Sequence, residues 1–451
     1  MAGSFKGGVH PNDFKTKTNS KPIEAAPIPK IVRIPMSQHL GAPCKPVVQK
    51  GDFVKKGQVV GEASGFVSAP VHSSVSGKVV DVIPYPHIFG TTVPCAIIEN
   101  DNQEEWAPNT NQECADVNTL SVDEIKNRIK SAGIVGMGGA TFPCHVKISP
   151  PPGKTITSFI LNGCECEPYL TSDHRLMLEK PDEIIQGMLL LCKTIGVKNK
   201  YIGIESNKPD AVKIMRETAA KYDNSIKVVN LHMKYPQGAE KQLIKAVINR
   251  EVPSGGLPMD VGALVHNVGT AYAVYEAVKY QRPCIERIVT ITGDGVQNPK
   301  NLLARVGITV AELLEFCGVK DTTNKLILGG PMMGLAQFTD EVVVTKGTSG
   351  ILVLTDAKAE KYYPCIRCGR CVDACPMGLV PSTISILGEA DNIDEAKTNN
   401  VLDCIECGCC AYVCPSKRPI VQFVKYCKSE LRIKDLKEKV KKEAELKQKT
   451  A

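Results

Sequence analysis

Between residues 121 and 281 the apolar residues follow two alternating patterns. Short continuous apolar runs predict buried strands, and longer segments with apolar residues three or four positions apart predict helices. The strands are expected at Ile156–Leu161, Tyr201–Ile204 and Val228–Leu231, and the helices at Val122–Ser131, Pro181–Ile195, Asp210–Tyr222 and Gly238–Asn249. Strands that alternate with helices predict an α/β domain with a mostly parallel sheet.

Other patterns flank this domain. Residues 1–30 are rich in Pro, Lys and Asn and predict an extended arm. Residues 31–110 alternate short β runs with glycine turns and predict an all-β unit of hairpins. Residues 286–345 predict a ββ-α-β unit, whose helix is expected at Thr309–Cys317. Residues 360–426 place helical segments between cysteine loops, and residues 427–451 form a basic tail.

Composition narrows the functional classes. The chain has 451 residues, of which 43% are hydrophobic and 23% charged, as in ordinary globular proteins. No apolar run approaches the roughly 18 residues that a membrane span needs, so we expect none. Met1–Ser20 has no apolar signal-peptide core. Without a secretory signal, 19 cysteines favour metal ligation in a reducing compartment, which makes the cytoplasm the expected location.

The net charge of +7 is unevenly placed. Residues 425–449 contain ten Lys and Arg against five Asp and Glu, so the rest of the chain is nearly neutral. A nearly neutral body argues against nucleic acid as a partner. The basic tail is expected to be a solvated helix, or a segment that meets acidic lipid headgroups or a partner protein.

Two cysteine runs near the end of the chain carry the strongest chemical signal. Both have the spacing C-x-x-C-x-x-C-x-x-x-C-P, which is typical of paired [4Fe–4S] clusters whose fourth cysteine binds the other cluster. One cluster is therefore assigned to Cys365, Cys368, Cys371 and Cys414, and the other to Cys404, Cys407, Cys410 and Cys375. Zinc is the alternative, but it does not explain three evenly spaced cysteines followed by Cys-Pro, twice. Cys409 fits no ligand position and is expected to be a buried spare thiol.

A glycine-rich stretch, Gly133–Pro143, is the next signal. Glycines let a backbone approach a phosphate closely, and Lys147 follows with a positive charge. Taken alone, such a stretch is better explained by a tight structural turn. The segment Asn162–Pro168 strengthens the phosphate interpretation, because it leaves the end of a buried strand, where ligands of α/β sheets bind. Tyr235–Glu240 and Val265–Thr270 add polar residues beside glycines at the edges of apolar segments.

The order of these motifs resembles the NADH-binding flavoprotein subunit of respiratory complex I, whose glycine loop, N-A-D-E-x-E-P, Y-x-x-G-E-E and N-N-V-E-T segments bind FMN or NADH. The motifs are still more similar to the RnfC family, the C subunits of Rnf electron transport complexes. Its I-V-G-x-G-G-A-x-F-P, N-G-x-E-C-E-P and E-V-P-S-G-G-L-P-M-D segments appear here, the last at Glu251–Asp260. The resemblance covers nearly the whole chain, including an N-terminal barrel-sandwich and a β-grasp unit.

By motif, the resemblance implies cofactor contacts from Gly136, Gly138, Gly139, Lys147, Asn162, Glu165, Glu167, Tyr235, Gly238, Glu240, Asn267 and Thr270. Glu240 matches a glutamate that faces NADH in the family. Three positions depart from the complex I motifs, namely Ala239, Cys164 and Thr141. Glu165 and Glu167 could instead be solvated carboxylates at a strand end.

Several residues near these motifs are expected to be structural. Cys164 and Cys166 lack further cysteines nearby and are expected to be packed thiols. His145 and His266 are expected to be hydrogen-bonded structural histidines. Residues 31–110 resemble the biotinyl/lipoyl barrel-sandwich family, but the hairpin that carries the modified lysine reads Glu62–Phe66 here. A structural or docking role is therefore expected for this unit.

The implied architecture is multidomain α/β: the barrel-sandwich, a central FMN/NADH-binding α/β domain, a β-grasp domain of the soluble-ligand-binding (SLBB) kind and an α-helical two-cluster ferredoxin module. The implied cofactors are FMN, NAD(H) and two [4Fe–4S] clusters, with no catalytic side chain required. A nicotinamide exchanges two electrons and a cluster one, and a flavin can connect them.

The resemblance implies a peripheral subunit on the cytoplasmic face of a membrane-bound Rnf complex, an ion-translocating ferredoxin:NAD+ oxidoreductase. Its partners would be NADH or NAD+ and the other subunits, including an iron–sulfur subunit that meets ferredoxin. Two alternatives are a soluble NADH dehydrogenase or diaphorase subunit and a non-catalytic ferredoxin-like electron wire.

Overall fold

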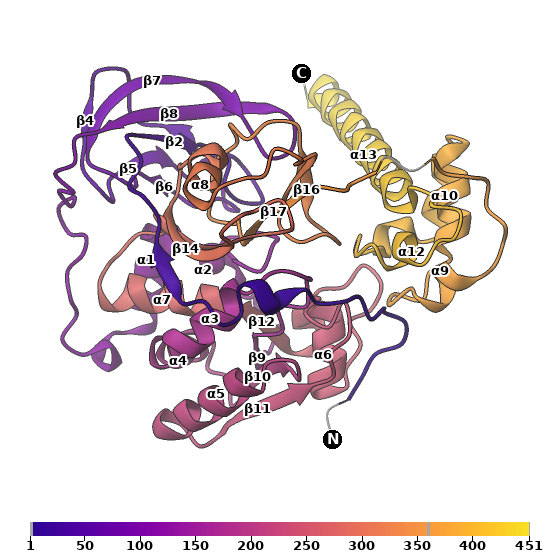
Figure 1. The fold of residues 1–451 in the computed structure, drawn as a ribbon, viewed down its shortest axis with the longest axis horizontal. Coiled ribbons are helices and arrows are strands. Elements are labelled where there is room, and N and C mark those ends of the chain that lie inside the picture. The colour runs from indigo at the N-terminus through magenta and orange to yellow at the C-terminus, as the bar shows by residue number, and fades with distance from the viewer. Residues whose placement is uncertain (1–2, 359–360, 451) are drawn as a thin grey trace.

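The computed structural model describes residues 3–358 and 361–450. A large body contains all the β structure, and a helical module lies beside it at the end of the chain (Figure 1). No helix in these ranges is long and apolar enough to cross a membrane.

The central domain is built on a four-stranded parallel sheet in the order β11-β10-β9-β12. The strands are β9 (Ser158–Asn162), β10 (Asn199–Glu205), β11 (Ile226–Leu231) and β12 (Ala263–Asn267). The helices are α1 (Val122–Ser131), α2 (Cys144–Lys147), α3 (Ser172–Glu179), α4 (Pro181–Ile195), α5 (Pro209–Tyr222), α6 (Glu240–Ile248) and α7 (Val268–Lys279). The predicted parallel α/β arrangement is therefore confirmed.

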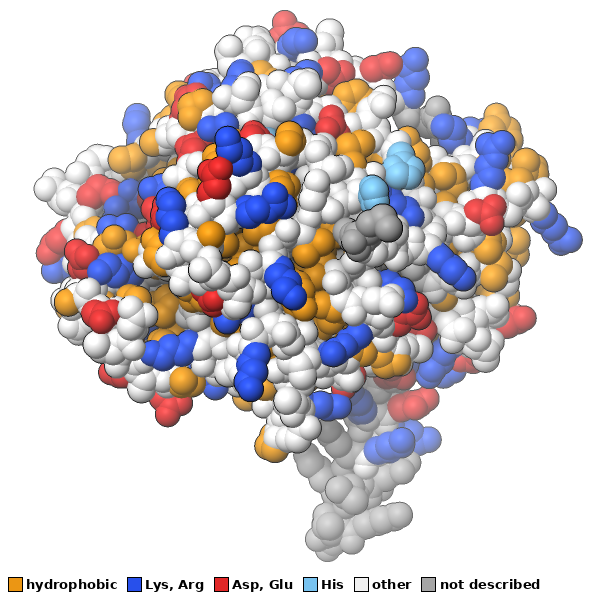
Figure 2. All heavy atoms as spheres, turned by 90° about the horizontal axis from the view of Figure 1, so that it is seen from below, with side chains coloured by type: hydrophobic (Ala, Val, Ile, Leu, Met, Phe, Trp, Pro, Cys, Tyr) orange, Lys and Arg blue, Asp and Glu red, His pale blue; other side chains and the backbone are white. Residues whose placement is uncertain are grey.

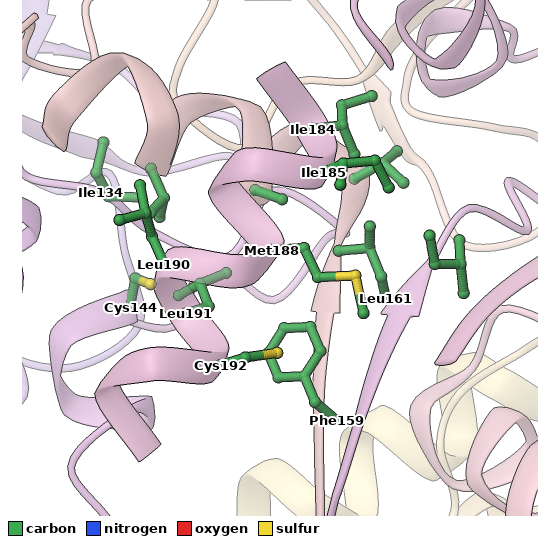
Figure 3. Close-up of a cluster of buried hydrophobic side chains, with 14 of the residues drawn as sticks. Ile134, Cys144, Phe159, Leu161, Ile184, Ile185, Met188, Leu190, Leu191 and Cys192 are labelled. Atoms are coloured by element: carbon green, nitrogen blue, oxygen red, sulfur yellow. The ribbon is translucent and has the colours of Figure 1, made fainter. Parts of the chain in front are cut away.

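Alternate residues of the central strand β9 supply the two sides of this core. Phe159 and Leu161 belong to the same buried cluster as Met188 and Cys192 of α4 (Figure 3). Ile160 lies in a separate cluster that includes residues of α6. This alternation follows from the two-residue period of a strand and buries β9 on both faces.

The sequence patterns missed β12, α3 and α7. Eight of the twelve residues of α7 are buried, so the polar stripe that marks an amphipathic helix is almost absent. Helix α4 crosses α7 at close range: a Cβ added at Gly187 would lie 1.9 Å from the Ala271 carbonyl oxygen. This approach requires glycine.

The N-terminal β unit consists of two small antiparallel sheets, ordered β2-β8-β7-β4 and β3-β5-β6. The strands are β2 (Ile31–Pro35), β3 (Lys45–Pro46), β4 (Phe53–Val54), β5 (Val59–Glu62), β6 (Val71–His72), β7 (Gly77–Pro86) and β8 (Thr92–Asn100). Valine and isoleucine residues from both sheets form one core, as the alternating pattern predicted.

A six-stranded mixed sheet forms the third unit, in the order β1-β14-β13-β17-β15-β16. Its elements are β13 (Glu286–Thr292), β14 (Lys300–Arg305), α8 (Val310–Cys317), β15 (Lys325–Leu328), β16 (Leu335–Gln337) and β17 (Gly350–Leu354). The edge strand β1 (Ile23–Ala25) comes from the N-terminal arm and pairs in parallel with β14. The arm is thus extended as predicted, but it is built into the body of the protein.

The C-terminal module contains α9 (Arg370–Asp373), α10 (Pro381–Glu389), α11 (Ile393–Thr398), α12 (Cys409–Tyr412) and α13 (Ile420–Thr450). Helix α13 includes the basic tail and projects away from the body (Figure 1). The body face in Figure 2 mixes Lys and Arg with Asp and Glu, so no single charge dominates it.

Candidate functional site

The glycine-rich stretch forms a loop between α1 and α2. Its base is closed by a hydrogen bond from the Gly136 amide to the Phe142 carbonyl, 2.8 Å long. The Met137 amide donates to the Thr270 hydroxyl at 2.9 Å, which ties the loop to the first turn of α7. At Gly139, φ is +121° and an added Cβ would meet nothing within 4 Å, so the loop is open there.

Two asparagines mark the carboxyl ends of adjacent strands. Asn162 of β9 and Asn267 of β12 are direct partners in the parallel register. Asn162 donates to the Gly238 carbonyl at 2.8 Å, and Asn267 donates to an Asp173 carboxylate oxygen at 2.6 Å. The sheet therefore gathers three of the predicted segments at one edge, where ligands of parallel α/β sheets bind.

The segment around Gly238 completes this edge. A Cβ added at Gly238 would lie 3.2 Å from the Cys166 sulfur, so a larger residue would crowd the strand-end loop. Lys147 and Glu240 form an ion pair at 2.7 Å, and both side chains are partly exposed. Asn267 also lies close to the glycine loop, 3.3 Å from the position of a Cβ at Gly138.

Glu165 and Glu167 are not solvated, so that alternative is wrong. Glu165 accepts hydrogen bonds from the Asp173 and His174 amides at the beginning of α3. Glu167 accepts bonds from the Met332 and Met333 amides of the β-grasp unit. Burial raises the pKa of Glu167 above the usual value for a glutamate. Both carboxylates fix the loop that follows β9.

Two buried lysines, which no sequence pattern indicated, support the same loop. Lys15, from the N-terminal arm, donates to the carbonyls of Glu165, Glu167 and Leu170, and burial lowers its pKa. Lys208 is fully buried and donates to the Cys164 carbonyl at 2.6 Å. An isolated lysine in a polar segment carries no local pattern from which such a contact could be predicted.

Tyr235 lies differently from what its motif implies. It is 2% exposed, and its hydroxyl donates to the carbonyl of Cys407 at 2.8 Å. Its backbone pairs with Val9 of the arm in both directions. The side chain is therefore directed at the cysteine-rich module, and it links the sheet edge to one of the two cysteine runs.

The eight predicted cluster cysteines line two separate hollows. The inner hollow is lined by Cys375, Cys404, Cys407 and Cys410, and the outer hollow by Cys365, Cys368, Cys371 and Cys414. Each hollow thus takes three cysteines from one run and the fourth from the other.

Each hollow offers four of the predicted cysteines, which is the donor set of a [4Fe–4S] cluster. Among the described residues, no three His, Cys, Asp or Glu side chains converge closely enough to hold a single metal ion. Cys409 lines the inner hollow, is 1% exposed and directs its sulfur at the Tyr235 carbonyl, as expected of a spare thiol.

The sheet edge also fits a polar cofactor. Near it, two buried nitrogens lack a hydrogen-bond partner among the described residues, namely Nε2 of Gln237 and Nε2 of His266. Each of these residues is next in sequence to a predicted contact residue. A bound phosphate, ribityl chain or ring would offer such nitrogens a partner, because buried polar groups are rarely left unsatisfied.

Within the part of the chain that the structure describes, Nε2 of His266 has no hydrogen-bond partner, and the ring packs against Phe159, with centroids 5.9 Å apart. Burial lowers the pKa of His266 well below its usual value, and Lys147 lowers it further. The residue is therefore a neutral, buried histidine. Cys164 is fully buried and Cys166 partly buried, as expected of packed thiols.

Comparison with protein families gives four matches in order along the chain. They are the RnfC barrel sandwich hybrid domain (residues 3–103), the Nuo51 FMN-binding domain (129–276), the SLBB domain (288–336) and the 4Fe-4S dicluster domain (364–417). The predicted order of folds is confirmed, and so are FMN and [4Fe–4S] clusters as the cofactors of these domains.

Among solved structures, a chain of the NAD+-reducing [NiFe]-hydrogenase in the air-oxidized state is similar, with a TM-score of 0.47 and 17% identity over 61% of this chain and 54% of that one. This likeness is too weak to carry an argument.

Curated relatives extend over nearly the whole chain. The C subunit of the proton-translocating ferredoxin:NAD(+) oxidoreductase complex of Clostridium ljungdahlii is 51% identical over 98% of this chain and 97% of its own length. The C subunit of the Na(+)-translocating ferredoxin:NAD(+) oxidoreductase complex of Acetobacterium woodii is 45% identical over 95% of this chain and 97% of its own length. The chain therefore belongs to the RnfC family, the C subunits of the ion-translocating ferredoxin:NAD(+) oxidoreductase, or Rnf, complexes.

Proposed function

We propose that this chain passes electrons between NADH or NAD+ and a one-electron partner, by way of FMN and two [4Fe–4S] clusters. It would do so as the peripheral subunit of a membrane-bound, ion-translocating ferredoxin:NAD+ oxidoreductase. Family membership and the FMN-binding and dicluster domains support this function. Bound flavin supplies the chemistry that the chain needs, because it exchanges a hydride with nicotinamide and single electrons with clusters.

The contact between Tyr235 and Cys407 carries the proposal. Tyr235 belongs to the same loop as Gly238, just before α6, and its hydroxyl donates to the backbone carbonyl of Cys407 in the inner hollow. The predicted flavin site and the inner hollow are therefore in direct contact through one buried side chain. Electron exchange between two centres requires this kind of close approach.

The chain contributes binding and position. Lys147 and the open amides around Gly139 suit a phosphate, because they combine positive charge with free N–H donors. Asn162 and Asn267 are held in place by their own hydrogen bonds, and they lie at the strand ends that would line the cofactor site. Glu240 is the residue we assign to NADH. None of these side chains has to act as an acid or base.

The assignment of residues is part of the proposal. The outer cluster would be held by Cys365, Cys368, Cys371 and Cys414, and the inner cluster by Cys375, Cys404, Cys407 and Cys410. The flavin site would be the edge formed by the glycine loop, the two strand ends and the Gly238 segment. We also propose domain boundaries near residues 30, 110, 121, 281 and 360, so that β17 (Gly350–Leu354) stays with the sheet of the β-grasp unit and the predicted end at residue 345 moves toward 360.

The place of the chain in the cell is a proposal too. We assign it to the cytoplasmic face of the membrane, held by the other subunits of the complex. One of those subunits would be an iron–sulfur protein that meets ferredoxin. A soluble NADH dehydrogenase or diaphorase is not favoured, because the RnfC barrel sandwich domain is present and the relatives match over almost their full length.

The test is an iron, flavin and EPR count on the purified chain. We expect releasable FMN and two reducible [4Fe–4S] clusters, and NADH should bleach the flavin absorbance. A brown preparation that releases no flavin after gentle removal of iron would favour the electron-wire alternative. A flavin-loaded chain that NADH does not bleach would contradict the proposed reaction with nicotinamide.

A further inference from the structure

The surface over the outer hollow is unusually open. Residues 361–370 are all exposed except Cys365, which is partly exposed. Ile366 is 67% exposed and Tyr363 is 57% exposed, and the thiol-bearing residue Cys368 also belongs to the exposed class. Apolar side chains that are this exposed, next to a cysteine of a cluster site, indicate a surface that contacts another protein rather than one that faces only solvent.

This surface is also basic. Residues 361–370 contain the exposed residues Lys361, Arg367 and Arg370 and no acidic residue. Within the described part of the chain, neither Arg367 nor Arg370 forms an ion pair with a carboxylate. Arginine with free donors is well suited to carboxylates on another protein. The open face therefore combines apolar side chains with uncompensated positive charge.

The inner hollow lies against the body of the protein. The carbonyl of Cys407 accepts from Tyr235, the Pro376 carbonyl accepts from Gln242, and Gly408 lies against the Met332 backbone. The arm covers another side, since a Cβ at Gly7 would lie 2.5 Å from the Cys375 carbonyl. The body of the protein therefore occupies this side of the module.

We infer that the outer cluster is the terminal one, and that residues 361–370 form the docking surface for the one-electron partner. The inference rests on the proposed function and adds the order of the centres and the chemistry of the partner. The partner fitted by this surface is an iron–sulfur protein with an acidic face beside its own cluster. One electron crosses in each encounter: one cluster is oxidised as the other is reduced, so one hydride corresponds to two encounters.

The test uses the cofactor-loaded chain and a purified acidic 2[4Fe–4S] ferredoxin as the probe. The double variant Arg367→Glu, Arg370→Glu should bind this probe about tenfold more weakly at low ionic strength, and the difference should shrink as salt is added. Isothermal titration measures the affinity. Iron content and the EPR signals of both clusters should match those of the unaltered chain.

The matched control is Lys437→Glu, Lys441→Glu, which makes the same change in charge on the projecting part of α13. It should leave the affinity unchanged. Equal weakening by both double variants would overturn the inference, because it would show a response to net charge alone. Unchanged affinity in the arginine variant would overturn it as well.

A third variant keeps the test decisive if the arginine changes disturb the cluster loop. Ile366→Glu alters an exposed side chain and should also weaken the binding of the probe. Unchanged binding with intact clusters would contradict the proposed docking surface. Failure of the proposed function would look different: flavin would be missing or NADH would not reduce it, whatever the affinity for the probe.

Discussion

The two cysteine hollows have the same ligand spacing, yet their surroundings differ. The inner hollow is covered by Tyr235, Gln242 and the N-terminal arm. The outer hollow is lined by Ile366 and Cys368, which are both exposed. In the proposed electron path, the two copies of the motif take different positions because their neighbours differ, since the proposed ligands themselves are equivalent.

The largest expected effect comes from removing one cysteine of each hollow. Cys368→Ala and Cys407→Ala should each lose about half of the iron, because each removes a ligand of one of two clusters. In Cys368→Ala, NADH should still reduce the flavin and the inner cluster. In Cys407→Ala, NADH should reduce the flavin and leave the outer cluster oxidised.

Iron analysis and EPR of samples reduced with NADH check this pair. Unchanged iron content in either variant would contradict the proposed ligands. If NADH still reduced the outer cluster in Cys407→Ala, the order of the two centres would be wrong.

A smaller effect is expected at the contact that joins the inner hollow to the sheet edge. Tyr235→Phe removes the donor to the Cys407 carbonyl in a buried place, so it should lower the free energy of unfolding by about 1–2 kcal/mol. Urea denaturation measures this change, and stopped-flow reduction by NADH should show slower arrival of electrons at the inner cluster.

The control is Tyr363→Phe in the outer region, where the ring is exposed. It should leave the stability and the NADH-driven rate unchanged. A similar loss in both variants would mean that the buried hydrogen bond is not what distinguishes the inner hollow.

Two glutamates, one near each hollow, should contribute to stability with opposite dependence on pH. Burial raises the pKa of Glu167 near the inner hollow, so its folded form holds its proton more tightly than the unfolded chain does. Its stabilising contribution is therefore complete below the ordinary glutamate pKa and is lost as pH rises through the raised value. The Arg418 guanidinium lowers the pKa of Glu389 near the outer hollow, so that contribution is present above the ordinary pKa and is lost as pH falls.

Glu167→Gln and Glu389→Gln separate these two contributions. Glu167→Gln should lower stability overall, because one acceptor for the Met332 and Met333 amides is lost, and should remove the fall in stability with rising pH. Glu389→Gln should remove a fall in stability with acidification. Thermal melts from well below the ordinary glutamate pKa up to neutral pH measure both slopes, and slopes of the same sign would contradict the opposite pKa directions.

The smallest effect is expected for Cys409→Ala. Cys409 lines the inner hollow without being one of its proposed ligands, so both clusters should remain at full iron content. Loss of the small buried thiol should cost about 1 kcal/mol of unfolding free energy. Loss of half the iron would show that Cys409, and not a neighbour such as Cys410, is a ligand.

The sequence alone determined the architecture of this protein and the kinds of cofactor that it uses. Its periodicities predicted the α/β domain, the β unit and α8, since the residues that set these patterns are neighbours along the chain. The cysteine spacing predicted two four-cysteine sites, because cysteines three positions apart in the sequence lie within one tight loop. The glycine loop, Asn162 and Asn267 were found for the same reason: each belongs to a short motif.

Only the tertiary structure decided which neighbours these motifs have. Lys15 supports the loop at Glu165 and Glu167 from about 150 residues away in sequence, and nothing local to it predicts that contact. Packing between domains places Tyr235 against the inner hollow and leaves Arg367 on the surface. Because burial and hydrogen bonding across domains set the environment of each group, two identical cysteine patterns became a covered site and an open one.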